Sequence, residues 1–307
     1  MKVLFMGTPE FAVPTLKALN ESEHTVVGVF TQPDKAVGRK QIITPPPVKA
    51  YATENGLNVF QPKSLKTDEA FNIIEELEPD IIIVVAYGKI LPKNILEYPK
   101  YKCVNGHASL LPRHRGASPI QWSILCGDKI TGVTTQLMGE GIDTGDILLS
   151  SATDIGDNET AEELHDRLSV ICANLMLDTI KGIEEGKIIP IKQNDEHTNY
   201  APIITKEMGL IDFSKSSLEI HNLVRGFYPW PSAYFFIDGK RIKVLKTEVA
   251  DSSNKDFGTV IDTNGEFIIA CGNNTSIKLI TIQPESSKRM SASDYLKGHN
   301  LPKDFKI

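Results

Sequence analysis

The sequence predicts an α/β protein with a Rossmann-like, doubly wound and mostly parallel sheet, followed by a small C-terminal β-barrel domain. In the first half of the chain, strand-like apolar runs alternate with segments of helical period. This alternation is typical of parallel sheets with crossover helices. Near residue 187 a polar segment with two prolines begins. After it, short β-rich runs are separated by turn dipeptides, as in small barrels and sandwiches.

The strands of the first part are expected in six apolar runs. The run at 80–88, DIIIVVAYG, has five β-branched residues in succession, which favours a strand buried on both faces. The runs at 132–138 and 145–150 flank the glycine-rich turn GEGIDTG. The other three runs lie at 2–7, 25–31 and 102–107.

Two helices are well marked between these strands. From 67 to 77, apolar residues recur at three- and four-residue steps, and Pro79 prevents the helix from continuing. A longer helix is expected from Thr160, which has Glu163 in the position of a capping box. Gly186 is a suitable stop for it.

The change in hydrophobic pattern near residue 187 predicts three parts, namely an N-terminal domain at 1–187, a linker at 188–207 and an OB-like β-barrel at 208–307. The linker segment is polar, contains Pro190 and Pro202 and shows no clear period. In the last part, the dipeptides Asp238-Gly239 and Asn264-Gly265 are the strongest hairpin signals of the chain.

Composition excludes several classes of protein. The 307 residues carry a net charge of −6 with 41% hydrophobic residues, which describes a globular protein and not a general nucleic-acid binder. No apolar run approaches the roughly 20 residues of a membrane span, and the first residues lack a signal-peptide core. We therefore expect a cytoplasmic protein. The four cysteines are scattered, so neither a zinc site nor a disulfide framework is expected.

Familiar catalytic motifs are missing as well. The turn after the first strand reads GTPEFA, with only Gly7 where a dinucleotide fingerprint needs three glycines, and Pro9 removes an amide from it. No P-loop, no serine in a G-x-S-x-G turn and no HExxH occurs. The seven histidines are dispersed, and nothing favours a metal mechanism.

The segment CVNGHASLLPRHRGASPIQW, residues 103 to 122, is the strongest candidate for a reaction centre. Asn105 and His107 are two residues apart, so on an extended strand their side chains share a face. An amide and an imidazole together can hold a developing oxyanion, and a carboxylate such as Asp143 would favour the imidazolium form. Each residue alone also fits a structural role, because Asp143 could simply shape its turn.

The motif NGHASLLPRHRGASPIQ, followed by GEGIDTGDIL, resembles the signatures of the folate-dependent formyltransferases. The resemblance starts at MGTPEFAVPTL, runs through GVFTQPDKAVGRKQIITPPPVK, VVAYGKILP and GFYPWPSAY, and ends near KRMSASDYLKGHNLP. It implies transfer of a formyl group from 10-formyltetrahydrofolate to the amino group of initiator methionyl-tRNA, a step of translation initiation. No metal is implied, and a monomer is expected.

The resemblance also assigns residues to roles. The catalytic group of the family falls on Asn105, His107 and Asp143. The folate-contacting turn falls on Ser109, Leu110, Leu111 and Pro112, and the segment 84–92 would form part of the pterin pocket with Tyr87, Gly88 and Ile90. Gly106 departs from the family pattern, since many relatives have Val or Ile there.

Two basic regions are candidates for tRNA contact. The segment 31–49 is long for a strand-to-helix connection and carries Lys35, Arg39 and Lys40, of which Arg39 matches the key basic position of the related enzymes. In the last part, Arg241 and Lys243 share one strand face, and such a stripe can follow phosphates. Solvated loops and strand faces have the same composition, so this alternative stays open.

Three other functions fit part of the pattern. A formyltransferase that acts on a sugar-nucleotide amine would share the reaction centre. A formyltetrahydrofolate hydrolase would use water as the acceptor and would not need the C-terminal domain. A non-catalytic tRNA-binding protein would not need the Asn, His and Asp group.

Overall fold

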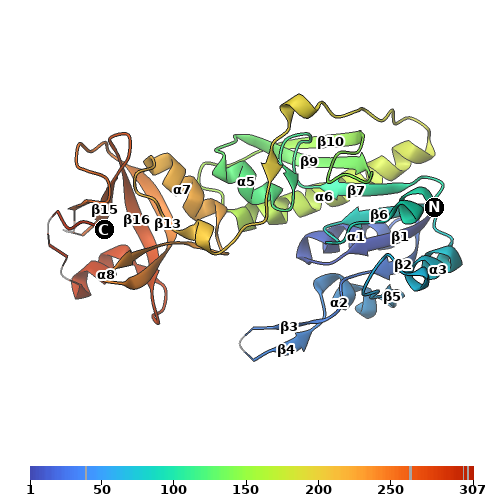
Figure 1. The fold of residues 1–307 in the computed structure, drawn as a ribbon, viewed down its shortest axis with the longest axis horizontal. Helices are drawn as coiled ribbons and strands as arrows, with labels where there is room; N and C mark the ends of the chain where they lie inside the picture. The colour runs from blue at the N-terminus through green and yellow to red at the C-terminus, as the bar shows by residue number, and fades with distance from the viewer. Residues whose placement is uncertain (39, 263–264, 300, 303) are drawn as a thin grey trace. The chain divides into compact units, whose positions relative to one another are not determined.

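The computed structural model describes residues 1–38, 40–262, 265–299, 301–302 and 304–307, and it divides into two compact units (Figure 1). Unit 1 comprises Met1–Pro119, Ile130–Asp154 and His165–Ala201. Unit 2 comprises Ile120–Lys129, Ile155–Leu164 and Pro202–Ile307. Two short segments of the N-terminal domain expected at 1–187 therefore belong to the same unit as the C-terminal sheet.

Unit 1 is built on a seven-stranded sheet in the order β10-β9-β7-β6-β1-β2-β5. The pairs among β5, β2, β1, β6 and β7 are parallel, and β9 and β10 are added antiparallel. The sequence prediction of a mostly parallel, doubly wound sheet is confirmed. The bounds are β1 Lys2–Gly7, β2 Thr25–Phe30, β5 Val59–Phe60, β6 Ile81–Val85, β7 Cys103–His107, β9 Ile130–Leu137 and β10 Ile147–Asp154.

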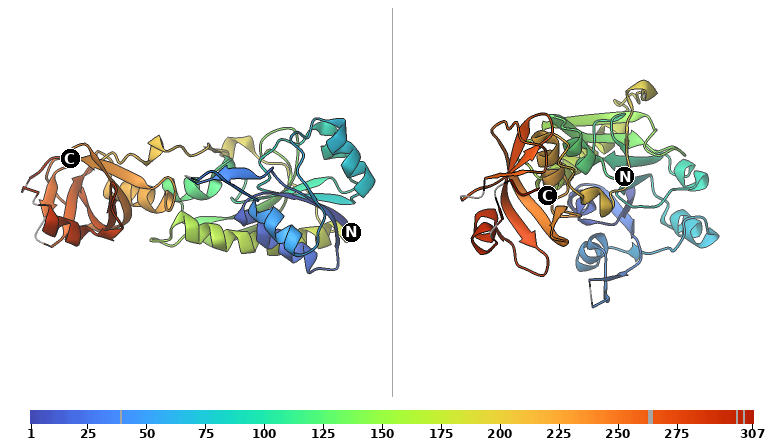
Figure 2. Two further views of the ribbon diagram at one scale, coloured as in Figure 1. Left: turned by 90° about the horizontal axis from the view of Figure 1, so that it is seen from below. Right: turned by 60° about the vertical axis from the view of Figure 1, so that its left-hand side comes forward.

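Helices cover both faces of this sheet, with α6 and α3 on opposite sides (Figure 2). Ala70 and Ile74 of α3 pack against Leu4 and Met6 of β1. All five residues of β6 are buried, and burying one such branched side chain contributes about 1.5–3 kcal/mol. The helices of unit 1 are α1 Val13–Asn20, α2 Pro47–Glu54, α3 Asp68–Leu77, α4 Lys93–Glu97 and, from His165 on, α6 Ala161–Glu184, with the 3-10 turn η1 at Glu10–Ala12. Helix α5, Pro119–Leu125, belongs to unit 2 from Ile120 on.

The two helices expected from the sequence begin and end close to the predicted residues. The Thr67 hydroxyl accepts a hydrogen bond from Ala70 N at the start of α3. At the start of α6, Thr160 and Glu163 exchange the reciprocal bonds of a capping box. Gly186 follows the end of α6 with a positive φ of 64°.

Packing against α6 explains why a glycine occupies position 106. A Cβ atom added to Gly106 would lie 2.6 Å from Cys172 Sγ and 3.3 Å from Met176 Cε, both on α6. The first distance is too short for two heavy atoms in van der Waals contact. The absence of a side chain therefore lets α6 approach β7 closely, on the face opposite Asn105 and His107.

Unit 2 contains a six-stranded antiparallel sheet, in the order β12-β13-β16-β15-β14 with β17 paired to β16. The bounds are β12 Ala233–Ile237, β13 Lys240–Ala250, β14 Val260–Asp262, β15 Phe267–Cys271, β16 Thr275–Pro284 and β17 Met290–Ser291. Helices α7, Ser217–Gly226, and α8, Ala292–Gly298, belong to the same unit. The prediction of a C-terminal antiparallel β domain is confirmed.

One of the two expected hairpin turns can be followed in full. Asp238 and Gly239 join β12 to β13 with φ angles of 50° and 73°, the left-handed pair that a two-residue hairpin needs. Asn264 lies outside the described residues, while the flanking strands β14 and β15 pair antiparallel.

The segment predicted as a linker, 188–207, is tied to unit 1 over most of its length. Ile191 exchanges backbone hydrogen bonds of 2.8 and 2.9 Å with Ile147 on β10. Tyr200–Ala201 forms strand β11, which pairs with β8, Arg115–Gly116. The structure therefore assigns 188–201 to unit 1 and not to a free connection. Long-range hydrogen bonds, which polarity alone does not reveal, hold it there.

Candidate active site

The site lies at the carboxyl edge of the parallel strands in unit 1. Strands β1, β6 and β7 run in the same direction, so the loops that follow them meet at one edge, where ligands bind in such sheets. Thr8, just after β1, donates a hydrogen bond of 3.0 Å to the carbonyl oxygen of Tyr87, just after β6. The Thr8 hydroxyl therefore joins two loops of the site.

Asn105, His107 and Asp143 are brought together there. Asn105 and His107 lie on β7, and His107 Nδ1 is 3.6 Å from Asp143 Oδ2. The other ring nitrogen, Nε2, is 2.9 Å from the carbonyl oxygen of His114. Both nitrogens of the buried ring thus face oxygen atoms of neighbouring residues.

The backbone of Asp143 is unusual in a way that fits a functional position. Its φ is 54°, a left-handed conformation that costs energy for a residue with a side chain. Two hydrogen bonds hold it, because Gly116 N donates to Asp143 Oδ2 at 2.9 Å and Gln193 Nε2 donates to its carbonyl oxygen at 2.9 Å. The first bond therefore holds the carboxylate and the second holds the backbone of Asp143.

Gln136 is a site residue that sequence reasoning missed. It lies on β9 directly opposite Asn105 and is 2% exposed. Its Nε2 donates to Asn105 Oδ1 at 3.3 Å and to Asp143 Oδ1 at 3.0 Å. The one signal in the sequence was a polar residue inside the apolar run 132–138, and that signal does not give the strand register.

Residues 109 to 112 form a rigid turn after β7. The Ser109 hydroxyl donates to Arg113 O at 2.6 Å. Thr134 on β9 clamps the turn, since its hydroxyl donates to Ser109 O at 2.7 Å and accepts from Leu111 N at 3.1 Å. Leu110 and Pro112 remain half-buried. The Ser109 side chain is used inside the turn, so any ligand contact here would come from the shape and backbone of the segment.

The segment after β6 is divided between core and surface. Tyr87 is 1% exposed in the cluster around β1 and α3, and burial raises the pKa of its phenol to about 12. Its hydroxyl has no hydrogen-bond partner among the described residues. Gly88 and Ile90 are exposed. Of the three residues assigned to the pterin pocket, only these two can offer accessible surface.

Comparison with known proteins matches this geometry to one family. The formyl transferase family matches residues 1–180, and its C-terminal domain matches residues 203–300. The chain belongs to the formyl transferase family. The family match covers both the sheet that carries Asn105 and His107 and the antiparallel sheet of unit 2.

The sequence similarity of this formyl transferase to known proteins extends over nearly the whole chain. It is 48% identical over 304 residues to a methionyl-tRNA formyltransferase of Caldanaerobacter subterraneus, covering 98% of both chains. It is 47% identical over 302 residues to the methionyl-tRNA formyltransferase of Clostridioides difficile, with the same coverage.

Solved structures agree on the fold. An N-formyltransferase from Helicobacter canadensis, in complex with folinic acid and dTDP-3-aminofucose, has a TM-score of 0.70 at 23% identity and covers 92% of this chain and 99% of its own. A sugar 3N-formyl transferase with dTDP and 5-N-formyl-THF has the same TM-score at 20% identity, over 94% and 99% of the two chains. No helix in the described part of this formyl transferase combines the length and the apolar content that a bilayer crossing needs.

The segment 31–49 contains a β-hairpin where the sequence predicts only a long connection. Strands β3, Lys35–Val37, and β4, Ile42–Thr44, pair antiparallel and project from unit 1 (Figure 1). Lys35 and Lys40 are exposed, whereas Arg39 lies outside the described residues. Burial, and then the charge of Lys35, lowers the pKa of Lys89. The hairpin therefore brings positive charge towards the loop after β6.

Arg241 and Lys243 lie on one face of β13, as predicted. Arg241 is exposed and Lys243 half-buried, while Ile242 and Val244 are each 1% exposed. The Arg241 guanidinium lies 5.7 Å from the centre of the Tyr234 ring on β12, within range of a cation–π contact. The face is accessible to a polyanion, and the opposite face is core.

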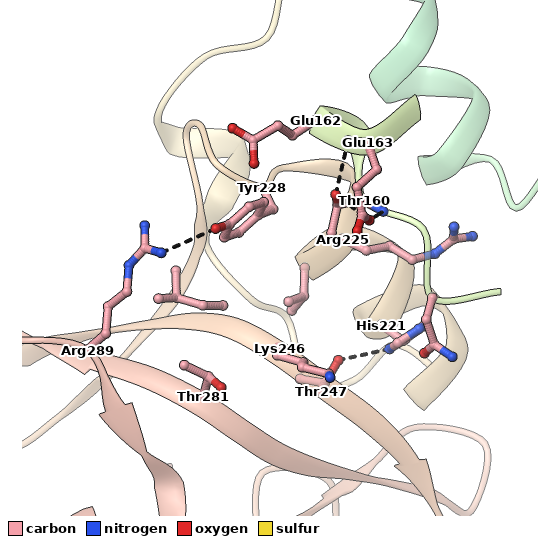
Figure 3. Close-up of a pocket in the computed structure, with 13 residues that line it drawn as sticks. Thr160, Glu162, Glu163, His221, Arg225, Tyr228, Lys246, Thr247, Thr281 and Arg289 are labelled. Atoms are coloured by element: carbon pink, nitrogen blue, oxygen red, sulfur yellow. Dashed lines mark hydrogen bonds between the residues drawn. The ribbon is translucent and has the colours of Figure 1, made fainter. Parts of the chain in front are cut away.

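Unit 2 also contains a cavity of about 510 Å³ (Figure 3). Tyr228 and Arg289 face each other across one side of it and share a hydrogen bond of 3.2 Å. On another side Arg225 donates to the carbonyl oxygens of Gly156 and Glu159, both at 3.1 Å. None of the site residues predicted from the sequence lines this cavity. It is therefore distinct from the candidate active site, whose residues belong to unit 1.

Proposed function

We propose that this chain transfers a formyl group from 10-formyltetrahydrofolate to the amino group of initiator methionyl-tRNA, with Asn105, His107 and Asp143 as the catalytic residues. The relatives that carry the name methionyl-tRNA formyltransferase extend over nearly the whole chain. The observation that carries the residue assignment is the convergence of an amide, an imidazole and a carboxylate at the carboxyl edge of the sheet. In this proposal the protein acts in the cytoplasm as a monomer.

The reaction is a direct acyl transfer. The deprotonated amine of methionyl-tRNA attacks the formyl carbon, a new C–N bond forms, and the carbonyl oxygen becomes an oxyanion. Asn105 Nδ2 donates a hydrogen bond to that oxyanion and the positive charge of protonated His107 stabilises it, which is the largest contribution expected for such chemistry. The bond from the formyl carbon to N10 of tetrahydrofolate then breaks.

Asp143 supports this step in two ways. Its negative charge, 3.6 Å from His107 Nδ1, stabilises the imidazolium. Through a water molecule it also receives the proton lost by the amine, and that proton ends on N10 of the departing tetrahydrofolate. The reaction therefore needs no covalent intermediate between the formyl group and the enzyme.

Binding roles follow from the placement of the remaining residues. We assign the folate to the turn Ser109–Pro112 and to the segment after β6, where Gly88 and Ile90 offer surface and the buried Tyr87 shapes the wall. The tRNA is assigned to the hairpin residues Lys35, Arg39 and Lys40, and to Arg241 and Lys243 on β13. In this proposal residues 1–187 are the catalytic domain and 208–307 the tRNA-binding domain.

One experiment separates this function from its rivals. The protein is incubated with 10-formyltetrahydrofolate and either methionyl-tRNA, an amino sugar nucleotide, or buffer alone. We expect formyl-methionyl-tRNA in the first arm and no turnover in the other two. Formate released in buffer at the rate of the first arm would identify a hydrolase. Formylation of the sugar nucleotide alone would identify a sugar formyltransferase and contradict the proposal.

A further inference from the structure

The orientation of the amides in the site can be traced to one buried arginine. Arg115 is 2% exposed, and its Nε and Nη2 donate to Gln193 Oε1 at 2.9 and 2.8 Å. A guanidinium can only donate. The oxygen of the Gln193 amide must therefore face Arg115, and its nitrogen must face the opposite way.

The nitrogen of Gln193 meets acceptors, as this orientation requires. It donates to the carbonyl oxygens of Asp143 at 2.9 Å and Gly145 at 2.6 Å, and it also lies 3.3 Å from Gln136 Oε1. Backbone carbonyls cannot donate, so the assignment is fixed at both ends of Gln193. Gln136 then presents its oxygen to Gln193 and its nitrogen to the site.

The same reasoning fixes Asn105. Gln136 Nε2 donates to Asn105 Oδ1 at 3.3 Å and to Asp143 Oδ1 at 3.0 Å. The oxygen of Asn105 thus points at Gln136, and its Nδ2 donates one hydrogen to Val84 O at 3.1 Å. The second hydrogen of Asn105 Nδ2 has no acceptor among the described residues. It is the donor that a formyl oxygen would meet.

We propose that Gln136 is a positioning residue, which fixes the Asn105 amide with its nitrogen towards the reacting carbonyl and fixes Asp143 beside His107. This inference rests on the proposed function, because it acts through two residues assigned to catalysis there. Gln136 has no direct contact with the formyl group in this account. Its effect is on kcat and on the protonation behaviour of the site, not on substrate affinity.

The two ends of an asparagine amide have similar size and shape, so only its hydrogen-bond partners, here Gln136 and the Val84 carbonyl, distinguish its two orientations. In one of them the oxygen of Asn105 would face the developing oxyanion, and like partial charges would repel. Gln136 and the Val84 carbonyl exclude that orientation together, because the nitrogen of Gln136 can only donate and the oxygen of Val84 can only accept. It also supplies one of the hydrogen bonds that hold the Asp143 carboxylate, which is 18% exposed.

The first test replaces Gln136 by Met, which keeps the length of the side chain and removes its hydrogen bonds. Losing a donor to a charged carboxylate costs about tenfold or more in an equilibrium constant. We therefore expect kcat for formylation of methionyl-tRNA to fall about tenfold or more, with both KM values changed less than about threefold. The matched control is Thr135→Val on the same strand, which breaks a buried bond of 2.8 Å to Thr179 on the opposite face. It should lower the melting temperature and leave kcat unchanged.

The second test, Gln136→Glu, has a readout that a purely structural role would not move. When ionised, the introduced carboxylate would repel Asp143 and leave Asn105 without a donor, whereas in its protonated form it restores one hydrogen-bond donor. Because two adjacent carboxylates cannot both ionise easily, the pKa of one of them is raised. The rate of Q136E relative to wild type should therefore rise as the pH is lowered from about 9 to about 6.

The outcomes separate this inference from the function on which it rests. If wild type does not formylate methionyl-tRNA, the proposed function fails before any variant is compared. If wild type is active, a kcat of Q136M equal to that of Thr135→Val overturns the positioning role. A ratio of Q136E to wild type that stays flat with pH overturns it as well, even where both variants are slow.

Discussion

The residues predicted for catalysis and those predicted for tRNA contact differ in how firmly neighbouring groups fix their side chains. Asn105, His107 and Asp143 are buried or half-buried and are bound on several sides by neighbouring groups. Arg241 is exposed and Lys243 half-buried on a strand face that meets solvent, and the contact that holds the Arg241 guanidinium is with the face of the Tyr234 ring. A transition state requires donors at defined positions. Attraction of phosphates depends mainly on the number of accessible charges.

This contrast predicts different kinetic signatures for the two regions. Substitutions of Asn105, His107 or Asp143 should lower kcat, and the size of this loss should depend little on salt concentration. Substitutions of Arg241 or Lys243 on β13 should raise the KM for tRNA, and this increase should become smaller as salt is added.

His107→Ala should cause the largest loss. It removes the imidazole that stabilises the oxyanion and is the partner of Asp143, and loss of such a group costs about 10²–10⁴-fold in rate. We expect kcat for methionyl-tRNA formylation to fall by about 10³-fold while the protein keeps its fold, as checked by circular dichroism. A variant that turned over at nearly the wild-type rate would falsify the assignment of His107.

Gly106→Val should act on stability. The added side chain would overlap Cys172 and Met176 of α6, and overpacking of a core costs about 1–3 kcal/mol. We expect a melting temperature several degrees below that of wild type. Adding Cys172→Ala in the same chain should recover part of the loss, because it removes the nearest atom. Equal melting temperatures for wild type and the single variant would show that α6 does not need the glycine.

Arg241→Met and Lys243→Met should each have a small effect, limited to tRNA. We expect the KM for methionyl-tRNA to rise a few-fold at low salt with unchanged kcat, and the slope of log KM against log salt to fall by about one per removed phosphate contact. Lys278→Met is the matched control, since Lys278 on β16 is already paired with Glu266. If all three variants behave alike, the β13 face has no special part in tRNA binding.

The sequence predicted those residues of the site whose position follows from short-range spacing along the chain. The two-residue spacing of Asn105 and His107 on a strand predicts a shared side, and the glycine-rich turn places Asp143 beyond the next strand. These three residues lie together in the structure. For the fold, the uninterrupted apolar run of β6 and the capping box of α6 were enough to predict the elements.

The supporting residues could not be predicted in this way. Gln136 faces Asn105 only because β9 joins β7 antiparallel in one register, and a shift by one residue would turn it to the other face. Gln193 reaches the site because a polar segment without regular period returns to β10 and β8. Such a segment has the composition of a linker, and only its long-range hydrogen bonds distinguish it from one.

The most direct test of the account is a double-mutant cycle of Asn105 and His107, measured as single-turnover formyl transfer to methionyl-tRNA by rapid quench. Wild type, Asn105→Ala, His107→Ala and the double variant are compared under saturating 10-formyltetrahydrofolate. If both side chains hold the same oxyanion, each single variant loses about 10²-fold or more, and the double variant loses much less than the product of the two losses. Single variants with wild-type rates, or two losses that simply multiply, would contradict the convergence of the two groups on one carbonyl.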